Sequence, residues 1–123
     1  VKIKYGLSDK LTLGNLDATR DWGHAKDYVR AMVMILDQDK PNDFVCATGV
    51  SHSVRELCDY TFSKLDLDYN DFVEVDRKFY RPEELVHLKG DSSKLKSIGF
   101  KAEYTFETML DEMINHWLEF YNK

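Results

Sequence analysis

The sequence predicts an α/β fold, helix-rich with a few short strands, in a single domain over residues 1–123. Apolar residues recur at helical spacing in three segments, near residues 24–38, 54–65 and 106–118. A short continuous apolar run, residues 44–47, is typical of a strand that is covered on both faces. With 43% hydrophobic and 13% aromatic residues, the chain can build a core and is not expected to be disordered.

The first part of the chain is expected to end one helix and begin another. Val1–Leu7 resembles the last turn of a helix that Gly6 closes, and Leu11–Leu13 is a strand candidate. From residue 24 to about residue 38 one apolar face widens toward the end, which predicts a mostly buried helix. Pro41 ends this helix, and Phe44–Ala47 follows as the buried strand.

The second part carries two recognisable helix starts. Ser53 followed by Glu56 matches a capping box, and Thr105 precedes the last helix. Between these helices lie an acidic loop and a second strand candidate, Phe72–Val75. Asp91 is expected to cap a short helix that ends near residue 98. The inward faces are predicted to consist of Val54, Leu57, Cys58, Phe62 and Leu65 in the first helix and Phe106, Met109, Leu110, Met113, Ile114, Trp117 and Leu118 in the last.

The predicted strands are too few for an independent parallel sheet, because a buried strand needs neighbours on both sides. We therefore expect the chain to be a piece of a larger α/β protein or to rely on partner subunits. It begins at Val1 without a methionine, and no signal peptide is recognised.

Charge and composition exclude several classes of function. The net charge is −5 and the basic residues are scattered, so a nucleic-acid partner is not expected. No apolar run approaches the roughly 20 residues that span a bilayer, so a membrane partner is not expected either. Cys46 and Cys58 sit in apolar segments and are interpreted as buried free thiols rather than a disulfide, which favours a cytoplasmic location.

Most catalytic signatures are absent from the sequence. The four histidines are far apart, no HExxH or CxxC pair exists, and a metal site is not expected. Neither cysteine has the exposed, activated setting of a nucleophile, and no GxSxG, P-loop or GxGxxG motif is present. The acidic residues between positions 66 and 76 could pair as carboxylates, but a solvated loop is the simpler interpretation.

Anion recognition is the remaining chemistry. Arg20 lies just before a helix start, where free N–H groups favour negative charge. Arg81 lies in a loop with Glu84 three residues on. Two arginine forks could hold a diphosphate, and a carboxylate could accept hydrogen bonds from a ribose. The competing interpretation is ordinary surface salt bridges, such as Arg20 with Asp17 or Asp21.

Three segments, "LGNLDATRDWGHAKDYVRAM", "FVCATGVSHSVRELC" and "FYRPEELVHLKGDSSKLKSIGFKAEYTFETMLDEM", together resemble the GDP-mannose 4,6-dehydratase family of extended short-chain dehydrogenases/reductases. The resemblance covers nearly the whole chain, in the right order. Members of this family have an N-terminal Rossmann domain for NADP and a catalytic Tyr-x-x-x-Lys pair. Tyr60 with Lys64 matches that pair by spacing only, so the chain resembles the C-terminal, substrate-binding part with the Rossmann domain absent.

The resemblance implies roles for particular positions. Arg20 and Arg81 would bind the diphosphate of a GDP-sugar from two sides, and Glu84 would accept from the ribose. Leu13, Gly14 and Asn15 would lie near the guanine, mostly through their backbone. The resemblance also suggests that Asp21 and His24 brace the loop and that Trp22 packs. Between Leu65 and Arg81 this chain is shorter than many family members, which leaves the local loop path open.

The resemblance implies binding of GDP-mannose or a related GDP-sugar, on the route to GDP-fucose and other deoxysugars. It implies NADP as the cofactor of the full-length family, with no cofactor expected on this chain alone. We expect no dehydratase activity from the chain alone, and an oligomer because the face toward the Rossmann domain would be apolar. A non-catalytic binding or assembly module that keeps the fold without the reaction is the alternative.

Overall fold

The computed structural model describes residues 1–81, 85 and 87–122 of the chain. In these residues the helices are α1 (Ala25–Leu36), α2 (Val54–Ser63), α3 (Tyr69–Phe72), α4 (Ser93–Ser97) and α5 (Phe106–Tyr121), and a 3₁₀ turn η1 covers Arg77–Phe79. The strands are β1 (Leu11–Leu13), β2 (Thr19–Arg20), β3 (His52–Ser53) and β4 (Val73–Val75). The fold is thus helix-rich with a few short strands, as predicted.

The strands form two separate pairs. β1 and β4 pair in parallel with Leu11 opposite Val73, and β2 and β3 pair antiparallel with Arg20 opposite His52. The strand candidates at residues 11–13 and 72–75 are therefore confirmed to within one residue, and they lie side by side. β2 and β3 were not anticipated, because two-residue strands carry no pattern in the sequence.

Two of the expected helix starts are confirmed in detail. The Ser53 side chain accepts from the Glu56 N–H at 3.0 Å while the Glu56 carboxylate accepts from the Ser53 N–H, which completes a capping box. Thr105 caps α5 in the same reciprocal way, with Thr108 as its partner. At α4 the Asp91 carboxylate accepts from the Ser93 N–H, although the N-cap residue is Ser92, one residue later than expected.

The first residues form a closed helical turn, as the sequence predicted. The N–H of Tyr5 donates to the carbonyl of Val1, and the N–H of Leu7 donates back to the carbonyl of Lys2 at 2.9 Å. Gly6 takes φ +66°, the left-handed conformation that ends many helices. Residues 1–5 therefore have the geometry of the last turn of an α-helix.

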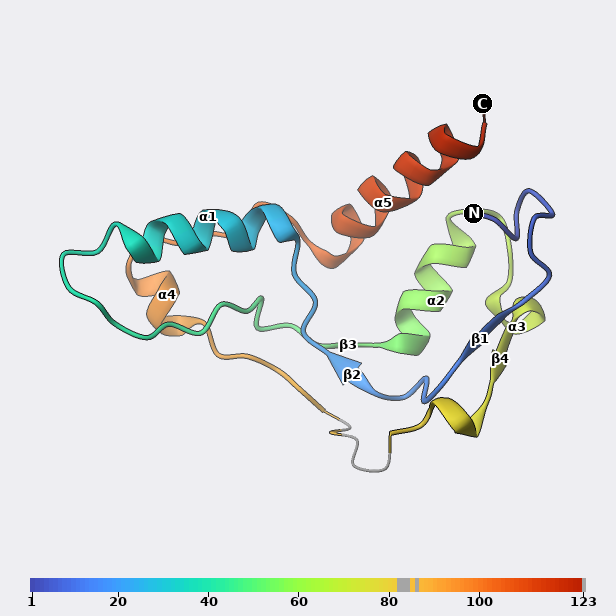
Figure 1. Cartoon of the computed structure of the whole chain (residues 1–123), viewed down its shortest axis with the longest axis horizontal. Coiled ribbons are helices and arrows are strands. Elements are labelled where there is room, and N and C mark those ends of the chain that lie inside the picture. The colour runs from blue at the N-terminus through green and yellow to red at the C-terminus, as the bar shows by residue number, and fades with distance from the viewer. Residues whose placement is uncertain (82–84, 86, 123) are drawn as a thin grey trace.

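The helices do not gather around one core (Figure 1). At one end α2 and α5 enclose a cluster of Leu65, Phe106, Leu110 and Ile114. At the other end α1 and α4 enclose a smaller cluster of Ala31, Leu95 and Phe100, with Phe44 and Cys46 packed against it. Asp27, only 3% exposed, ties α1 to the loop before α5 by accepting from the N–H groups of Glu103 and Tyr104.

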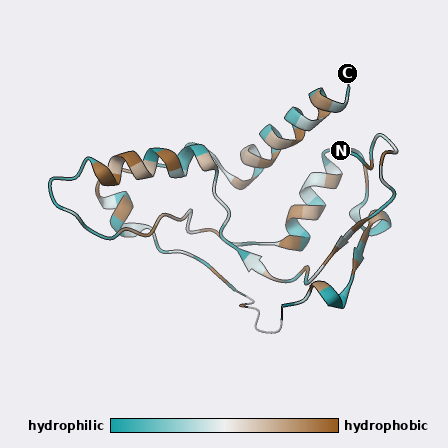
Figure 2. Cartoon of the chain, viewed as in Figure 1, coloured by the Kyte–Doolittle hydropathy of each residue, from teal (hydrophilic) through white to brown (hydrophobic). Residues whose placement is uncertain are grey.

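Two expectations about this second end are wrong. Residues 44–47 form no strand in the described structure, because no neighbouring strand lies beside them to accept and donate the ladder hydrogen bonds. The expected mostly buried helix, α1, instead has an apolar face in water, which Figure 2 shows as hydrophobic residues along its length. Its exposed apolar side chains are Val29, Met32, Val33 and Leu36, with exposed fractions from 55% to 82%.

The inward face predicted for α5 is correct only in part. Phe106, Leu110 and Ile114 are buried, whereas Met113 and Trp117 are 53% and 42% exposed. The total accessible surface is 8716 Å². A compact monomer of 14.4 kDa would expose about 6,800 Å², so roughly a fifth of this surface is in excess. The helices therefore present apolar surface that the described residues leave exposed.

Candidate functional site

Arg20, the last residue of β2, bonds to its neighbour Thr19 and to Leu85, which is far away in the sequence. Its Nη1 donates to the carbonyl oxygens of Thr19 and Leu85, both at 2.7 Å. Thr19 forms a parallel bridge with His87, and its hydroxyl lies 2.9 Å from the His87 Nδ1 atom. Leu85, His87 and Leu88 therefore all contact β2, and Leu85 provides a carbonyl to the Arg20 guanidinium.

Asp21 fixes the backbone directly after Arg20. Its carboxylate accepts from the N–H groups of Thr48 (2.9 Å), Gly49 (2.8 Å) and Gly90 (3.2 Å) and from the Thr48 hydroxyl (2.5 Å). We call these four residues the Asp21 junction. Three segments that are distant in sequence meet there, so the carboxylate acts as a brace, as the resemblance suggested.

The hydrogen bonds of the junction keep Asp21 ionised. Burial alone would raise the pKa of this carboxyl, but the bonds from Thr48, Gly49 and Gly90 outweigh it, and the pKa lies below its usual value. A carboxylate that accepts several N–H bonds is stabilised in its charged form, so the junction is intact at neutral pH.

His24 completes the bracing of this loop. It is the N-cap residue of α1, and its Nδ1 accepts from the Lys26 N–H at 3.0 Å. Its ring stacks on Tyr104 with centroids 3.8 Å apart, and its Nε2 lies 3.4 Å from a Glu112 carboxylate oxygen. Trp22 packs against the cluster at α2 and α5, stacked on Phe106. The expected supporting roles of His24 and Trp22 both match these contacts.

Leu13, Gly14 and Asn15 lie at the end of β1, next to η1. Leu13 pairs with Val75, and its carbonyl accepts from the N–H of Asp76 at 2.9 Å. A Cβ atom on Gly14 would come within 2.8 Å of the Phe79 carbonyl oxygen, so only glycine permits this close approach. Asn15 accepts from the Asp17 N–H through its side chain.

Arg81 lies on the stretch of chain between these two anchored points. It is exposed, two residues after Phe79, which contacts Gly14, and four residues before Leu85, which contacts Arg20. Because each residue spans at most ~3.6 Å, its Cα lies within about 7 Å of the Phe79 Cα and about 14 Å of the Leu85 Cα. Glu84 lies outside the described residues. The loop that carries Arg81 therefore connects the neighbourhood of Gly14 to that of Arg20.

The competing salt bridges of Arg20 involve carboxylates that have other partners. Asp17 accepts from both Nε and Nη2 of Arg55, the latter at 2.9 Å. Asp21 is engaged in its junction. The two carboxylates named in that alternative thus bond to Arg55 and to the junction donors, and the salt-bridge interpretation of Arg20 stays an alternative.

The other candidate groups prove to be structural. The Tyr60 hydroxyl donates to Asp111 at 2.9 Å, and Lys64 lies 3.1 Å from the same carboxylate, so both join α2 to α5 rather than forming a catalytic pair. Cys58 is buried and Cys46 partly buried, both are free, and burial raises the pKa of each thiol.

In the acidic segment, Asp68 caps α3, Glu74 pairs with Lys10 and Asp76 pairs with Lys78. This matches a solvated, capping segment rather than paired catalytic carboxylates. Among the described residues no His, Cys, Asp and Glu side chains group as a metal site, and no helix is long and apolar enough to cross a membrane.

Sequence reasoning missed Thr19, Leu85, His87 and the three donors of the Asp21 junction. Their roles depend on backbone groups that are between 27 and 69 residues away from Asp21, or 65 residues away from Arg20. Main-chain donors and acceptors are present at every residue, so they leave no signal in side-chain types.

Comparison with known proteins identifies the family that the chain matches. Its residues 1–113 match the profile of the family described as GDP-mannose 4,6 dehydratase. GDP-mannose 4,6 dehydratase 1 of Arabidopsis thaliana is 47% identical over 119 residues, covering 96% of this chain and 33% of the relative. GDP-mannose 4,6 dehydratase of Homo sapiens is 41% identical, covering 93% and 36%. The chain thus spans about a third of the length of these relatives.

Solved structures with the same fold are extended short-chain dehydrogenase/reductase enzymes. RMD from Pseudomonas aeruginosa, complexed with NADPH, superposes with a TM-score of 0.83 at 21% identity, covering 96% of this chain and 39% of that one. The dTDP-glucose 4,6-dehydratase of Bacillus anthracis, in complex with NAD, gives a TM-score of 0.79 at 20% identity, covering 96% and 37%. These likenesses confirm the predicted fold class and its partial extent.

Proposed function

Because the chain belongs to the GDP-mannose 4,6-dehydratase family, we propose that it supplies the part of such an enzyme that holds the GDP-sugar. The whole reaction would convert GDP-mannose to GDP-4-keto-6-deoxymannose. The chain's contribution would be binding energy from the GDP group, which is remote from the reacting carbons and helps to position the sugar.

The observation that carries this proposal is the position of Arg81 in the sequence between two residues with described contacts. Phe79 lies against Gly14 and Leu85 bonds to Arg20, and Arg81 comes two residues after the first and four before the second. We infer that the guanidinium groups of Arg20 and Arg81 approach one diphosphate from two sides, through paired N–H donors. The Asp21 junction supports this arrangement because it fixes the backbone next to Arg20.

The remaining contacts to the nucleotide are proposed from the same placement. Glu84 would accept from the ribose hydroxyls. Leu13, Gly14 and Asn15, at the end of β1, would meet the guanine mainly with backbone groups, which discriminate a base without a charged side chain.

The redox chemistry is proposed to lie outside this chain. NADP would supply hydride transfer in the full-length enzyme. Tyr60 and Lys64 cannot serve it here, because both are bound to Asp111 between α2 and α5. The exposed apolar face of α1 would meet the dinucleotide-binding half. Two free cysteines fit a reducing, cytoplasmic setting.

Calorimetric titration of the chain with GDP tests the proposal. We expect saturable binding that weakens tenfold or more in Arg81→Ala, because a charge-assisted contact to phosphate is lost. Arg77→Ala is the matched control, since it removes another exposed arginine, from η1 four residues earlier. No turnover of GDP-mannose is expected from the chain alone.

Two results would contradict the proposal. Absence of heat with GDP at millimolar concentration, in a chain shown by circular dichroism to be folded, would favour a module that keeps the fold without the site. Equal losses of GDP affinity in Arg77→Ala and Arg81→Ala would mean that the loss follows from the reduced positive charge and not from a specific contact of Arg81.

A further inference from the structure

The N-cap of α1 is a ring nitrogen of His24, which links the cap to the protonation state of the ring. Nδ1 accepts a hydrogen bond from the Lys26 N–H at 3.0 Å. A neutral imidazole has one nitrogen that donates and one that accepts, so the proton of this ring lies on Nε2. An imidazolium donates from both nitrogens and cannot accept from the Lys26 N–H. The cap of α1 therefore exists only while His24 is neutral.

Glu112 of α5 faces the other ring nitrogen. Its Oε2 lies 3.4 Å from the Nε2 of His24, and its Oε1 accepts from the Lys26 ammonium at 2.7 Å. The carboxylate thus faces the nitrogen that carries the proton, and it favours the tautomer in which Nδ1 is the acceptor. The bond from Lys26, with a smaller contribution from His24, holds the pKa of Glu112 below its usual value, so this group is ionised at neutral and mildly acid pH.

The other charged and titratable groups around His24 come from α1, α5 and the segment before α5. Tyr104 stacks on the ring with centroids 3.8 Å apart, and its hydroxyl accepts from the Lys26 ammonium at 3.3 Å. His116 and Glu119 of α5 line the same hollow as His24. A charged ring would therefore meet both the Lys26 cation and the carboxylates of α5, whereas only the neutral ring can also bond to the Lys26 N–H.

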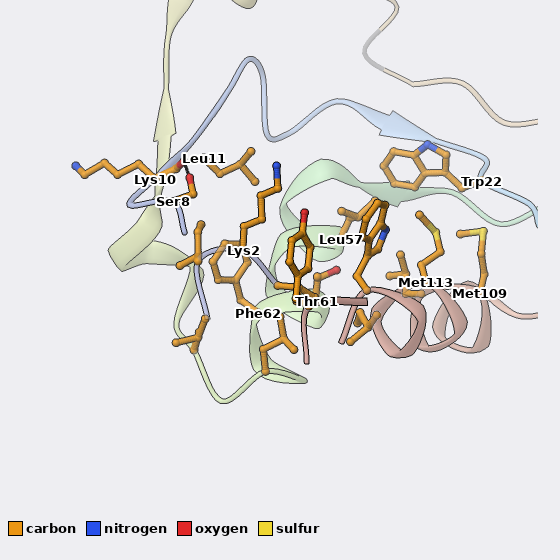
Figure 3. Close-up of a pocket in the computed structure, with 18 of the residues that line it drawn as sticks. Lys2, Ser8, Lys10, Leu11, Trp22, Leu57, Thr61, Phe62, Met109 and Met113 are labelled. Carbon is orange, nitrogen blue, oxygen red and sulfur yellow. Dashed lines mark hydrogen bonds between the residues drawn. The ribbon is translucent and has the colours of Figure 1, made fainter. Parts of the chain in front are cut away.

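The loop that ends at His24 also carries Arg20. Four residues separate the two positions, so their Cα atoms are at most about 14 Å apart. Between them, Trp22 lines the apolar pocket beside α2 and α5 (Figure 3). A Cβ atom on Gly23 would come within 2.3 Å of the Tyr28 hydroxyl of α1, so the loop lies close against this helix. Loss of the cap would therefore loosen one end of a short, closely packed loop.

We propose that His24 is a proton-dependent cap of α1 and that His24 and Glu112 are positioning residues for Arg20. The neutral ring holds the end of the loop, and protonation of the ring releases it. The positioning role rests on the proposed function, because Arg20 is the proposed ligand of the diphosphate. Neither residue touches the nucleotide, since both act through the backbone between Arg20 and α1. Acidification through the ordinary titration range of histidine therefore weakens the hold on a GDP-sugar.

The cap is tested first without any nucleotide, by nuclear magnetic resonance of the nitrogen-15-labelled chain. Between about pH 8 and about pH 5.5, a range that brackets the titration of histidines, the Lys26 amide should shift in one transition. The ring nitrogens of His24 should report the Nε2–H tautomer at the upper pH. His24→Asn keeps a cap acceptor that does not titrate, so its Lys26 amide should stay in place. A Lys26 amide that does not move in the unmodified chain would overturn the inference.

Calorimetry with GDP-mannose then tests the positioning role. The diphosphate of this ligand carries no proton that titrates in the same range, so any pH dependence comes from the chain. The unmodified chain should bind about fivefold more weakly at the lower pH, because the cap is lost. His24→Asn should bind at both pH values as the unmodified chain does at the upper one. His24→Phe can stack on Tyr104 but has no acceptor, and it should bind weakly at both.

Two further comparisons separate His24 from other titrating groups. Protonation of His87, beside Thr19, would strengthen the binding of an anion, so the sign of the change distinguishes the two histidines. Glu112→Gln keeps an oxygen that can accept from Nε2–H but removes the charge that favours an imidazolium, so the transition should move to lower pH. Glu119→Gln, about two helical turns further along α5, is the matched control and should leave the transition in place.

Three results of these comparisons would overturn the inference. The first is an affinity of the unmodified chain for GDP-mannose that is the same at both pH values. The second is His24→Phe binding as tightly as the unmodified chain, which would reduce His24 to ring packing. The third is an equal displacement of the transition in Glu112→Gln and Glu119→Gln. Absence of GDP-mannose binding at any pH, together with a titrating Lys26 amide, would contradict the proposed function and support the proton-dependent cap.

Discussion

The Asp21 junction and the apolar face of α1 differ in whether their interactions are made within the chain. At the junction one carboxylate satisfies donors from Thr48, Gly49 and Gly90, all within the chain. On α1, four large apolar side chains are more than half exposed. Residues 44–47, of which Phe44 and Cys46 pack against the cluster of Ala31, Leu95 and Phe100, have no neighbouring strand in the described structure. The donors of the junction thus have their acceptor within the chain, whereas the apolar side chains of α1 are not buried by the described residues.

This difference separates two sources of stability. The hydrogen bonds that position the Arg20 loop are made between segments of the same chain. Apolar burial on α1 requires a surface that the chain does not contain, since hydrophobic stabilisation depends on area removed from water. A binding site can therefore be preformed here even though much apolar surface stays exposed.

The largest effect should come from breaking the junction. Asp21→Ala leaves three backbone N–H groups without their acceptor and should lower the free energy of unfolding by about 2–4 kcal/mol. Asp17→Ala removes an exposed carboxylate paired with Arg55, and should cost less than about 1 kcal/mol. Urea denaturation followed by circular dichroism measures both. Similar losses in the two variants would mean that the junction contributes no more than a surface ion pair.

The next effect contrasts neighbouring residues of α1. Ala31 is fully buried against Leu95 and Phe100, so Ala31→Leu should overpack this cluster and cost about 1–3 kcal/mol. Met32 is 61% exposed, and Met32→Lys should change the free energy of unfolding by less than about 0.5 kcal/mol.

Sedimentation adds a second readout to this pair. If the α1 face drives association, the Met32→Lys chain should self-associate less than the unmodified chain. A loss of stability in Met32→Lys as large as that in Ala31→Leu would show that this face is packed in the folded chain.

The smallest effect is the acid dependence of stability. The pKa of Asp21 is lowered in the folded state, as is that of Asp27, where burial is outweighed by bonds from Glu103, Arg30 and Tyr104. Their stabilisation is present above the ordinary carboxyl pKa of about 4 and is lost as the pH falls through the lowered values. Unfolding free energy should therefore fall below about pH 4.

Two variants test the source of this acid sensitivity. Asp21→Asn should flatten the dependence, because the titrating group of the junction is removed. Met32→Lys should keep the slope of the unmodified chain, since this substitution leaves both Asp21 and Asp27 in place. An unchanged slope in Asp21→Asn would exclude the junction as a source.

The sequence predicted the helix starts and turns, because these depend on interactions between residues close together in the chain. The capping box at Ser53, the helix start after Thr105 and the turn closed by Gly6 depend on residues a few positions apart, and all three are found. Strand formation at Phe44–Ala47 and burial of α1 failed, because both depend on a neighbouring sheet that the described chain lacks. The hydrophobic pattern records an environment that lies outside these residues.

Some residues of the candidate site could be predicted from the sequence and others could not. Arg20, Arg81 and Glu84 could be proposed as anion and ribose ligands because their side chains have distinctive chemistry. The Leu85 carbonyl on Arg20 and the amides on Asp21 could not be found, since backbone groups carry no sequence signature. Close approach of Phe79 to Gly14 was also invisible, although it explains why glycine is needed there.

The most direct test of the diphosphate site is a comparison of GDP with GMP. Calorimetry on the unmodified chain should show GDP binding at least tenfold more tightly, because only GDP offers a second phosphate to be held between Arg20 and Arg81. In Arg81→Ala this preference should disappear while GMP affinity changes little. Equal affinities of the unmodified chain for the two nucleotides, or a preference for GDP that persists in Arg81→Ala, would contradict the account.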